Sequence, residues 1–359
     1  MASPAEPGEP NVPPERLAQN PLLSPHDLEA TRQDLCVLCT LNPGAARFGR
    51  ETLLLVRVGE AARPEPGTVA AVVWDDEAGE VRVRRYRHDD PDVELGDARG
   101  FAYRGRAMLT SLSHLRVARS ADGQRFRFDP QPAIFPATPY EAYGCEDPRI
   151  TFLDGRYYVT YSAVSPRGIA VGLAATDDFR TFERLGVMLP PTQKDVCIFP
   201  ERVRGQYVCR HRPCGDGFSA PAIWTAYSPD LVSWGRHEMT LAPTPGTWEG
   251  GRVGCGPPPI RTDQGWLEIY HAADEAGRYC LGAMLSDPDR PERILARSSR
   301  PVLQPETPYE LAGVYGNCVF SCGMVPEDDG RLTIYYGAAD SICAAAVTTV
   351  DEMVAAAQA

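Results

Sequence analysis

The sequence predicts an all-β protein, a five-bladed β-propeller with short helical extensions at its N- and C-terminal ends. Two observations carry this prediction. Short apolar runs and alternating apolar–polar runs, both typical of strands, follow one another from Leu53 onward. A strand that begins with Gly and is rich in aromatic residues also recurs, at a spacing of roughly 50–65 residues, which is in or near the range of propeller repeats. With about four strands to a repeat of that length, the chain accommodates about five blades.

The expected strands share these signatures along the whole chain. Apolar or alternating runs occupy residues 53–58, 69–74 and 81–86. The Gly-led aromatic strands are at 155–161, 205–209, 265–271 and 330–336. Strands rich in Ala and Gly follow two of them, at 169–174 and 281–285. Asp-containing turns at 176–179 and 228–231 separate neighbouring strands.

Helical periodicity is confined to residues 16–34 and 350–359, where we expect short helices that pack across the propeller. Residues 1–15 are rich in Pro, Glu and Ala and are expected to form a disordered lead-in. The expected organisation is therefore a single propeller domain over 16–350, followed by a short C-terminal tail over 351–359.

Charge and composition exclude several classes of function. The 359 residues carry a formal net charge of −12 and a pI near 5.1, so the chain lacks the basic footprint of a nucleic-acid-binding protein. No apolar run approaches the roughly 20 residues that span a bilayer. The first residues lack the basic and apolar regions of a signal peptide. We therefore expect no nucleic-acid or membrane partner, and a cytoplasmic protein. The 11 cysteines, an odd number, predict reduced structural thiols rather than a disulfide framework or a metal site.

The most informative motif is Glu146-Asp147-Pro148-Arg149, just before an expected strand at 151–153. Proline fixes its own φ and biases the preceding residue toward extended backbone, so we expect Asp147 at a strand entrance on a rigid rim. Taken alone, the motif favours an ion-paired turn over a catalytic carboxylate. We expect Arg149 to face outward and pair with Glu146, which leaves Asp147 directed into the central funnel.

Other polar residues stand next to expected inner strands of different blades. Each has an ordinary explanation, because a strand-ending cation commonly covers apolar surface and a strand-ending Asp commonly caps a turn. In a propeller, however, the mouths of the inner strands converge on one pocket. Together these residues predict a basic, donor-rich cradle suited to an oxyanion such as phosphate, opposite the carboxyl group of Asp147. The cradle residues are Lys194, Arg212, His271 and Tyr279.

The segments that contain these residues resemble the mannoside phosphorylases of glycoside hydrolase family 130. In chain order the resembling segments are 42–46, 57–58, 144–149, 194–195, 199–201, 211–213, 265–267, 270–271 and 335–340, and the resemblance extends over roughly residues 17–350. It implies that Asp147 is the general acid, acting through the 3-hydroxyl of the sugar. It also implies that the cradle residues are phosphate ligands. Residues that would hold the mannosyl ring are Asn42, Arg57 and Asp340, and Asp195 is assigned to the same substrate-binding group.

This set of residues fits phosphorolysis. An inverting hydrolase needs a second carboxylate to activate water, whereas a phosphorylase uses phosphate itself as the nucleophile. The expected function is therefore inverting phosphorolysis of a β-mannoside, which releases α-mannose 1-phosphate, with an oligosaccharide and phosphate as substrates and no further cofactor. Because the general acid must be protonated, we expect burial or Glu146 to raise the pKa of Asp147.

Two other functions fit the same scaffold. A hydrolase would hold a second carboxylate about 6.5–9.5 Å from Asp147, and Asp195 and Glu201 are the candidates. A non-catalytic propeller that binds carbohydrate would need no acid at all. Glucose, N-acetylglucosamine and mannose all remain open as the acceptor sugar, and the N-terminal segment is a candidate surface for a homo-oligomer.

Overall fold

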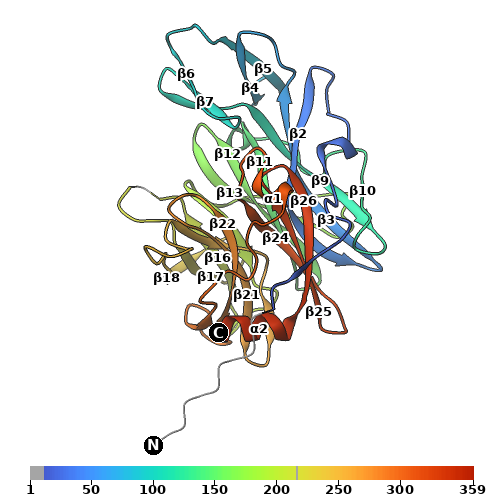
Figure 1. Ribbon diagram of the computed structural model, residues 1–359, viewed down its shortest axis with the longest axis vertical. Helices are drawn as coiled ribbons and strands as arrows, with labels where there is room; N and C mark the ends of the chain where they lie inside the picture. Colours follow the sequence, from blue (N-terminus) through green and yellow to red (C-terminus); the bar gives the residue numbers. More distant parts are fainter. Residues whose placement is uncertain (1–11, 216) are drawn as a thin grey trace, which may run out of the picture.

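The computed structural model describes residues 12–215 and 217–359 of the chain and is built almost entirely from β-strands (Figure 1). The all-β prediction is confirmed. Most of the lead-in expected over 1–15 falls on residues 1–11 and lies outside the described residues. Glu15, its last residue, already belongs to a strand.

The strands form antiparallel units that follow one another along the chain. The largest sheet has the order β14-β13-β12-β11-β9-β3-β2, with β10 paired to β9. Its strands are β2 (Leu35–Phe48), β3 (Glu51–Ala62), β9 (Ser111–Ser120), β10 (Arg127–Phe128), β11 (Gly144–Leu153), β12 (Arg156–Ser165), β13 (Gly168–Thr176) and β14 (Glu183–Leu189). A single parallel bridge, Gly144 to Ser113, joins β11 to β9, so the sheet consists of two antiparallel units in contact.

Three further sheets complete the body of the protein. One contains β15 (Gln193–Ile198), β16 (Tyr207–Pro213), β17 (Ile223–Ser228) and β18 (Gly235–Leu241). The next contains β19 (Arg252–Cys255), β20 (Ile260–Thr262), β21 (Gly265–Ala273), β22 (Tyr279–Ser286) and β23 (Ile294–Arg297). The last contains β24 (Val319–Pro326), β25 (Arg331–Ala338), β26 (Ile342–Thr349) and, from the other end of the chain, β1 (Glu15–Arg16). Short helices precede β11 and β24: a 3₁₀ turn η2 (Pro139–Glu141) and α1 (Pro308–Leu311).

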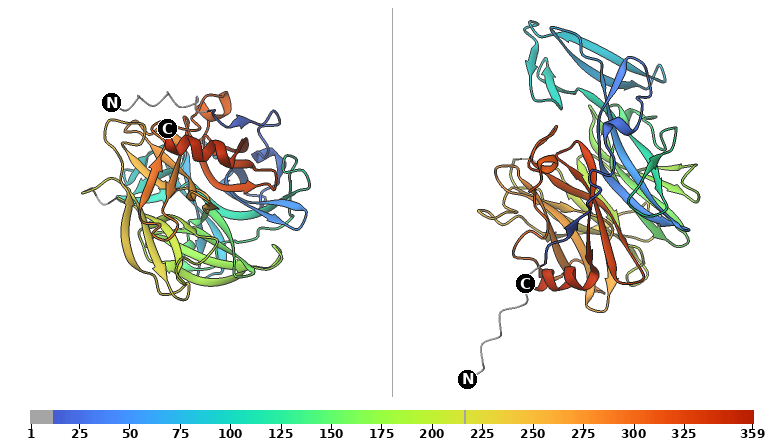
Figure 2. Two further views of the ribbon diagram at one scale, coloured as in Figure 1. Left: turned by 90° about the horizontal axis from the view of Figure 1, so that it is seen from below. Right: turned by 45° about the vertical axis from the view of Figure 1, so that its right-hand side comes forward.

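An insertion between β3 and β9 stands above these sheets (Figures 1 and 2). It consists of the hairpin β4 (Thr68–Asp75) and β5 (Glu80–Arg87) and a small sheet of β6 (Val93–Leu95), β7 (Gly100–Tyr103) and β8 (Arg106–Leu109). The sequence predicted the strands β4 and β5 but not their place. Because β3 and β9 pair directly, up to Ala61 with Ser111, everything between them leaves the main ladder.

The two ends of the chain meet on the last sheet. The helix expected over 16–34 is wrong for most of its length, since only η1 (Pro25–Asp27) is helical. β1 pairs instead with β26, the Asn20 side chain donates to the Ala345 carbonyl, and prolines at 21 and 25 disfavour a continuous helix. The expected C-terminal helix is present as α2 (Val350–Gln358). Its N-cap is Thr349, and its buried face, which includes Met353, packs on the core beside β22 and β23.

The first strands of several sheets approach one another closely at glycines. A Cβ atom at Gly44 in β2 would lie 2.6 Å from the carbonyl oxygen of Pro148 in β11. One at Gly323 in β24 would lie 2.7 Å from the carbonyl oxygen of Pro43 in β2. Only a residue without a side chain permits these approaches, which bring the motif segments of different sheets into contact.

Other global expectations concern cysteines, metals and membranes. All 11 cysteines are free thiols, including the pair Cys36 and Cys39 within β2. The described residues contain no group of three or more His, Cys, Asp or Glu side chains placed to hold a metal ion. Within residues 12–215 and 217–359, no helix combines the length and apolarity required to cross a bilayer.

Candidate active site

Three of the predicted site residues share the same backbone conformation, a positive φ at a β-bulge. Asn42, Asp147 and Asp195 have positive φ values of 47°, 50° and 54°. Each lies where the pairing register shifts in the first strand of an antiparallel unit: β2, β11 and β15. Asn and Asp tolerate this left-handed conformation better than most residues, and a bulge turns a side chain out of the ladder. Asp147 is therefore held at a bulge inside β11 rather than at the strand entrance that the motif predicted.

The predicted residues gather around one cavity of about 1280 Å³. Of the nine, eight line it, from sheets far apart in the sequence: Asn42, Arg57, Asp147, Lys194, Asp195, Arg212, Tyr279 and Asp340. His271 is the exception. Glu201, one of the two candidate hydrolase bases, is half-exposed, does not line the cavity and lies 4.0 Å from Arg261.

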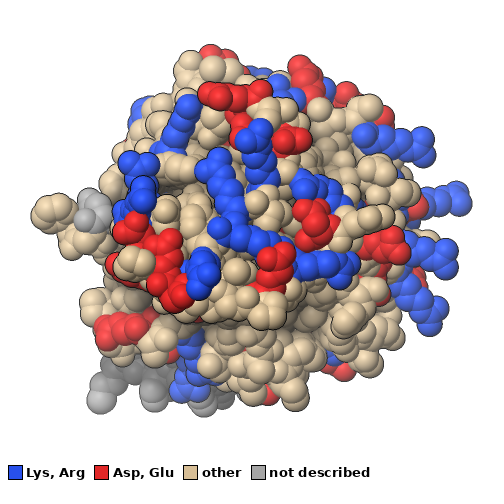
Figure 3. All heavy atoms as spheres, turned by 90° about the horizontal axis from the view of Figure 1, so that it is seen from above, with Lys and Arg blue, Asp and Glu red and all other residues tan. Residues whose placement is uncertain are grey.

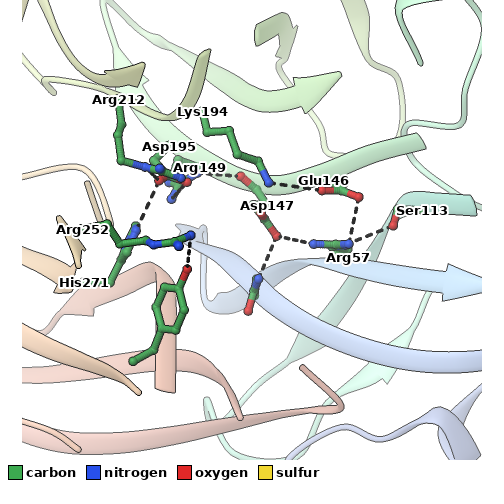
Figure 4. A network of polar contacts seen from close by, with 12 residues as sticks. Arg57, Ser113, Glu146, Asp147, Arg149, Lys194, Asp195, Arg212, Arg252 and His271 are labelled. Carbon is green, nitrogen blue, oxygen red and sulfur yellow. Dashed lines mark hydrogen bonds and ion pairs between the residues drawn. The ribbon is translucent and has the colours of Figure 1, made fainter. Parts of the chain in front are cut away.

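Asp147 is buried and already has polar partners. Its Oδ1 accepts a hydrogen bond from Asn42 Nδ2 at 2.8 Å and another from Arg57 Nη1 at 3.0 Å (Figure 4). Burial acts to raise the pKa of Asp147, but the charges of Arg57 and Lys194 and the Asn42 hydrogen bond more than offset it. The pKa of Asp147 consequently lies below its usual value, so the expectation of a raised pKa is wrong for the cavity without substrate.

The expected pair of Glu146 with Arg149 is also wrong. Glu146 accepts from Arg57 Nη2 at 2.8 Å, and its other oxygen lies 3.6 Å from Lys194 Nζ. Arg149 points inward and is almost fully buried. Its guanidinium donates to the carbonyl oxygens of Asp147 at 3.1 Å and Cys255 at 2.9 Å. The bulge at Asp147 and Pro148 shifts the alternation of side chains along β11, which the one-dimensional motif does not reveal.

Asp195 is the centre of a buried ionic cluster. It accepts a hydrogen bond from Arg212 Nε, lies 3.4 Å from Arg149 Nη2 and lies 3.2 Å from His271 Nε2 (Figure 4). Burial acts to raise its pKa, but Arg212 and His271 hold the pKa of Asp195 well below its usual value. A carboxylate with both oxygens engaged in this way anchors cations and is poorly placed to activate water. Neither candidate base therefore has the surroundings that a hydrolase requires.

His271 lies behind this cluster instead of at the cavity wall. Its side chain is fully buried and packs on Phe320, with ring centroids 4.2 Å apart. Burial lowers the pKa of His271 despite the carboxylate of Asp195 beside it, which favours the neutral imidazole. In this arrangement His271 does not line the cavity itself and contacts residues that do, namely Asp195, Phe320 and Tyr279.

Tyr279 and a residue that sequence reasoning missed line the cavity beside the Asp195 cluster. Tyr279 lies at the start of β22, and its hydroxyl accepts a hydrogen bond from Arg252 Nη1 at 3.1 Å (Figure 4). Arg252 begins β19 and lines the cavity. Its only signal in the sequence is an arginine in a Gly-rich segment, 250–256, and no motif singled it out.

Asp340 lies in the turn between β25 and β26 with a φ of 50°. Burial raises the pKa of Asp340 to about 6, and although Arg57 opposes this shift, the charge of Asp147 adds to it. The pKa values of these two carboxyl groups are thus shifted in opposite directions: that of Asp147 falls below its usual value, whereas Asp340 becomes protonated as the pH falls through about 6.

The insertion supplies the roof of the cavity. Residues of β6–β8 and their loops line it, among them Glu94, Asp97 and Arg99. The guanidinium of Arg99 lies over the ring of Tyr315, 4.6 Å from its centroid, so the insertion contacts the loop before β24 across the cavity. Seen from above, where the insertion lies, the Lys and Arg side chains are interleaved with Asp and Glu (Figure 3). Ion pairs such as Arg104 with Asp92 account for part of that pattern.

Fold and cavity together define a class of protein: an all-β scaffold whose sheets jointly line one cavity with carboxyl groups and a cluster of cations, the arrangement of a site for a polar substrate. The family model described as beta-1,4-mannooligosaccharide phosphorylase matches residues 100–358. The chain belongs to this family, glycoside hydrolase family 130.

Individual relatives span most or all of the chain. A beta-1,2-mannobiose phosphorylase from Listeria innocua is 39% identical over 348 residues, which cover 94% of this chain and 96% of the relative. A 1,2-beta-oligomannan phosphorylase from Thermoanaerobacter is 40% identical over 67% of this chain and 80% of the relative. The solved structure of a beta-1,2-mannobiose phosphorylase from Listeria innocua, in complex with beta-1,2-mannobiose, superposes with a TM-score of 0.92 at 38% identity. It covers 96% of this chain and 98% of that one.

Proposed function

We propose that the protein is an inverting glycoside phosphorylase that cleaves β-mannosides with inorganic phosphate and releases α-mannose 1-phosphate. The observation that carries the proposal is the cavity itself, in which the buried carboxyl group of Asp147 lies beside cations contributed by other strands and sheets, among them Arg57 and Lys194. The relatives named above act on mannosides as phosphorylases, which favours the same reaction type.

In the proposed reaction an oxygen of phosphate attacks the anomeric carbon of the mannosyl unit as the glycosidic bond breaks. The proton of Asp147 goes to the leaving oxygen, by way of the sugar 3-hydroxyl that the family resemblance implies. Lys194, Arg212 and Tyr279 line the cavity as donors for the phosphate oxygens and would orient the attacking one. Asn42, Arg57 and Asp340 would bind the mannosyl hydroxyls.

The low pKa of Asp147 is compatible with its role as an acid. Arg57 and Lys194 stabilise its anion in the cavity without substrate. A phosphate dianion bound beside the same cations would compete for their charge and raise the pKa of Asp147, so that the acid becomes protonated as the nucleophile arrives.

Within this reaction we assign Asp195 and His271 to positioning. Asp195 holds the guanidinium groups of Arg149 and Arg212, and His271 packs against Asp195. His271, which the family resemblance implies to be a direct phosphate ligand, would thereby act on phosphate only indirectly.

We further propose that the cleaved bond is β-1,2 and that the acceptor is mannose. Three relatives at 38–40% identity act on 1,2-linked mannobiose or oligomannan, whereas the relative named for mannosyl-glucose is 30% identical. Of the three acceptor sugars that the sequence left open, we therefore propose mannose rather than glucose or N-acetylglucosamine.

For the scaffold we propose the five-bladed propeller. The first strands of the five antiparallel units contact one another in a ring, which supports closure. β24 meets β2 at Gly323, β2 meets β11 at Gly44, and β11 meets β15 where Thr151 donates to the Ile198 carbonyl at 2.9 Å. β15 meets β19 at Gly254, and the end of β19 approaches Ser321 of β24 at Gly256.

The test is a comparison of sugar release from β-1,2-mannobiose, β-1,4-mannobiose and mannosyl-glucose with and without phosphate. Phosphate-dependent formation of α-mannose 1-phosphate from the β-1,2 substrate is expected. Equal release of mannose without phosphate would identify a hydrolase instead. If no mannoside is cleaved under either condition while mannosides still bind, the protein is a carbohydrate-binding module.

A further inference from the structure

Arg252 differs from the other cations around the cavity in having no carboxylate partner. Arg57 pairs with Glu146 and Asp147, and Lys194 lies beside Glu146. Arg149 and Arg212 share Asp195. On the roof, Arg99 pairs with Asp97. Among the described residues, no Asp or Glu lies within ion-pair distance of Arg252, whose hydrogen bond goes to the hydroxyl of Tyr279.

The placement of Arg252 makes this charge available to a ligand. Arg252 is exposed, yet it lines the cavity together with Lys194, Arg212 and Tyr279. In Figure 4 its side chain extends toward the space that Asp147 and the Asp195 cluster enclose. A guanidinium carries five N–H donors in a planar fork, and the contact with Tyr279 occupies Nη1 only.

The charges around the cavity support an anionic ligand. Five cations, namely Arg57, Arg149, Lys194, Arg212 and Arg252, face the three carboxylates Glu146, Asp147 and Asp195. This surplus of two positive charges is local, because the rest of the cavity lining adds Arg99 and the carboxyl groups of Glu94, Asp97 and Asp340. Without Arg252 half of that surplus is lost.

We propose that Arg252 is a further ligand of the phosphoryl group, both of inorganic phosphate and of α-mannose 1-phosphate, and that Tyr279 orients it. This inference rests on the proposed function. Arg252 contributes a forked pair of donors to the phosphate oxygens, while the Tyr279 hydroxyl fixes the plane of the fork. A sugar hydroxyl is the weaker candidate, because it would leave the unpaired charge uncompensated.

The variants Arg252→Ala and Arg252→Lys test the inference, with Arg300→Ala as the control, since Arg300 is exposed and does not line the cavity. For Arg252→Ala we expect the KM for phosphate to rise about 10- to 100-fold, the range for a hydrogen bond to a charged group. The KM for α-mannose 1-phosphate in the synthetic direction should rise in parallel. The KM values for mannobiose and for acceptor mannose should stay within about twofold. Arg252→Lys keeps the charge and loses the forked pair of donors, so its KM for phosphate should lie between those of Arg252→Ala and wild type. The KM for phosphate of Arg300→Ala should equal that of wild type.

A KM for phosphate within twofold of wild type in Arg252→Ala overturns the inference, as does a rise confined to mannobiose or acceptor mannose. Calorimetric titration with inorganic phosphate alone measures its dissociation constant without catalysis. In Arg252→Ala this dissociation constant should rise by a factor similar to that of the KM for phosphate. Should Arg252→Ala fail to fold, Arg252→Lys still reports the loss of the fork, and an unchanged KM for phosphate in that variant would overturn the inference. Absence of phosphate dependence in the wild type would refute the proposed function itself. Phosphate dependence with an unchanged Arg252→Ala would refute only the role of Arg252.

Discussion

Replacing Asp195 by Asn removes one negative charge from the most crowded ionic cluster of the cavity and leaves its shape nearly unchanged. Two guanidinium groups, those of Arg149 and Arg212, then share no carboxylate, and all three side chains are buried. We expect Asp195→Asn to destabilise the folded protein and to make its stability unusually sensitive to phosphate.

The magnitude follows from burial. Breaking a buried ion pair by removing one partner costs about 3–5 kcal/mol, because an uncompensated charge remains in a poorly solvated place. At about 2 °C for each kcal/mol, the lower end for large domains, Tm should fall by roughly 6–10 °C. Phosphate bound next to the uncompensated guanidinium groups would replace the missing charge, so phosphate should raise the Tm of Asp195→Asn by more than it raises that of wild type.

The matched control is Glu268→Gln. Glu268 forms an equally buried pair with Arg210, at 2.8 Å between Oε2 and Nε, but neither residue lines the cavity. Thermal denaturation monitored by circular dichroism, with and without phosphate, should show a comparable fall in Tm for both variants and an enlarged phosphate response only for Asp195→Asn. Equal phosphate responses in the two variants would refute the idea that Asp195 balances the cations of a phosphate site.

Three further predictions address the acid, the sugar site and the packing behind the cluster. Asp147→Asn should lower kcat by about 10²- to 10⁴-fold, the usual contribution of a general acid, and retained activity in a phosphorolysis assay would exclude that role. Because the pKa of Asp340 is about 6, its carboxylate should be lost as an acceptor of sugar hydroxyls as pH falls through 6. The KM for mannobiose should therefore rise from pH 7 to pH 5, and an unchanged pH profile in Asp340→Asn would contradict this assignment. Gly254→Ala should lower Tm and raise the KM for phosphate, since its Cβ would collide with His271 and lie 2.6 Å from Asp195 Oδ2; wild-type values for both would contradict the packing described here.

Local sequence was sufficient for the strands and for most of the cavity residues. Alternating and Gly-led patterns located β3, β4, β5, β12, β21 and β25, since a strand is recognised from the side chains of its own residues. Polar residues beside expected inner strands predicted seven of the residues that line the cavity, and the family resemblance added Asn42. The sequence contains one further indication of the site: of the 36 Lys and Arg residues, Lys194 is the only lysine and all the others are arginine.

The sequence by itself determined the all-β class, many of the strands and the polar residue types around Asp147, because these depend on neighbours within a few positions. Only the tertiary structure decided that the Arg149 side chain points inward, that His271 is buried behind Asp195, and that β6–β8 form the roof of the cavity. It also decided that the pKa of Asp147 lies below its usual value and that Arg252 stands unpaired beside Tyr279. Those properties depend on bulges that redirect side chains and on charges brought together from different sheets, and the spacing of residues along the chain contains neither.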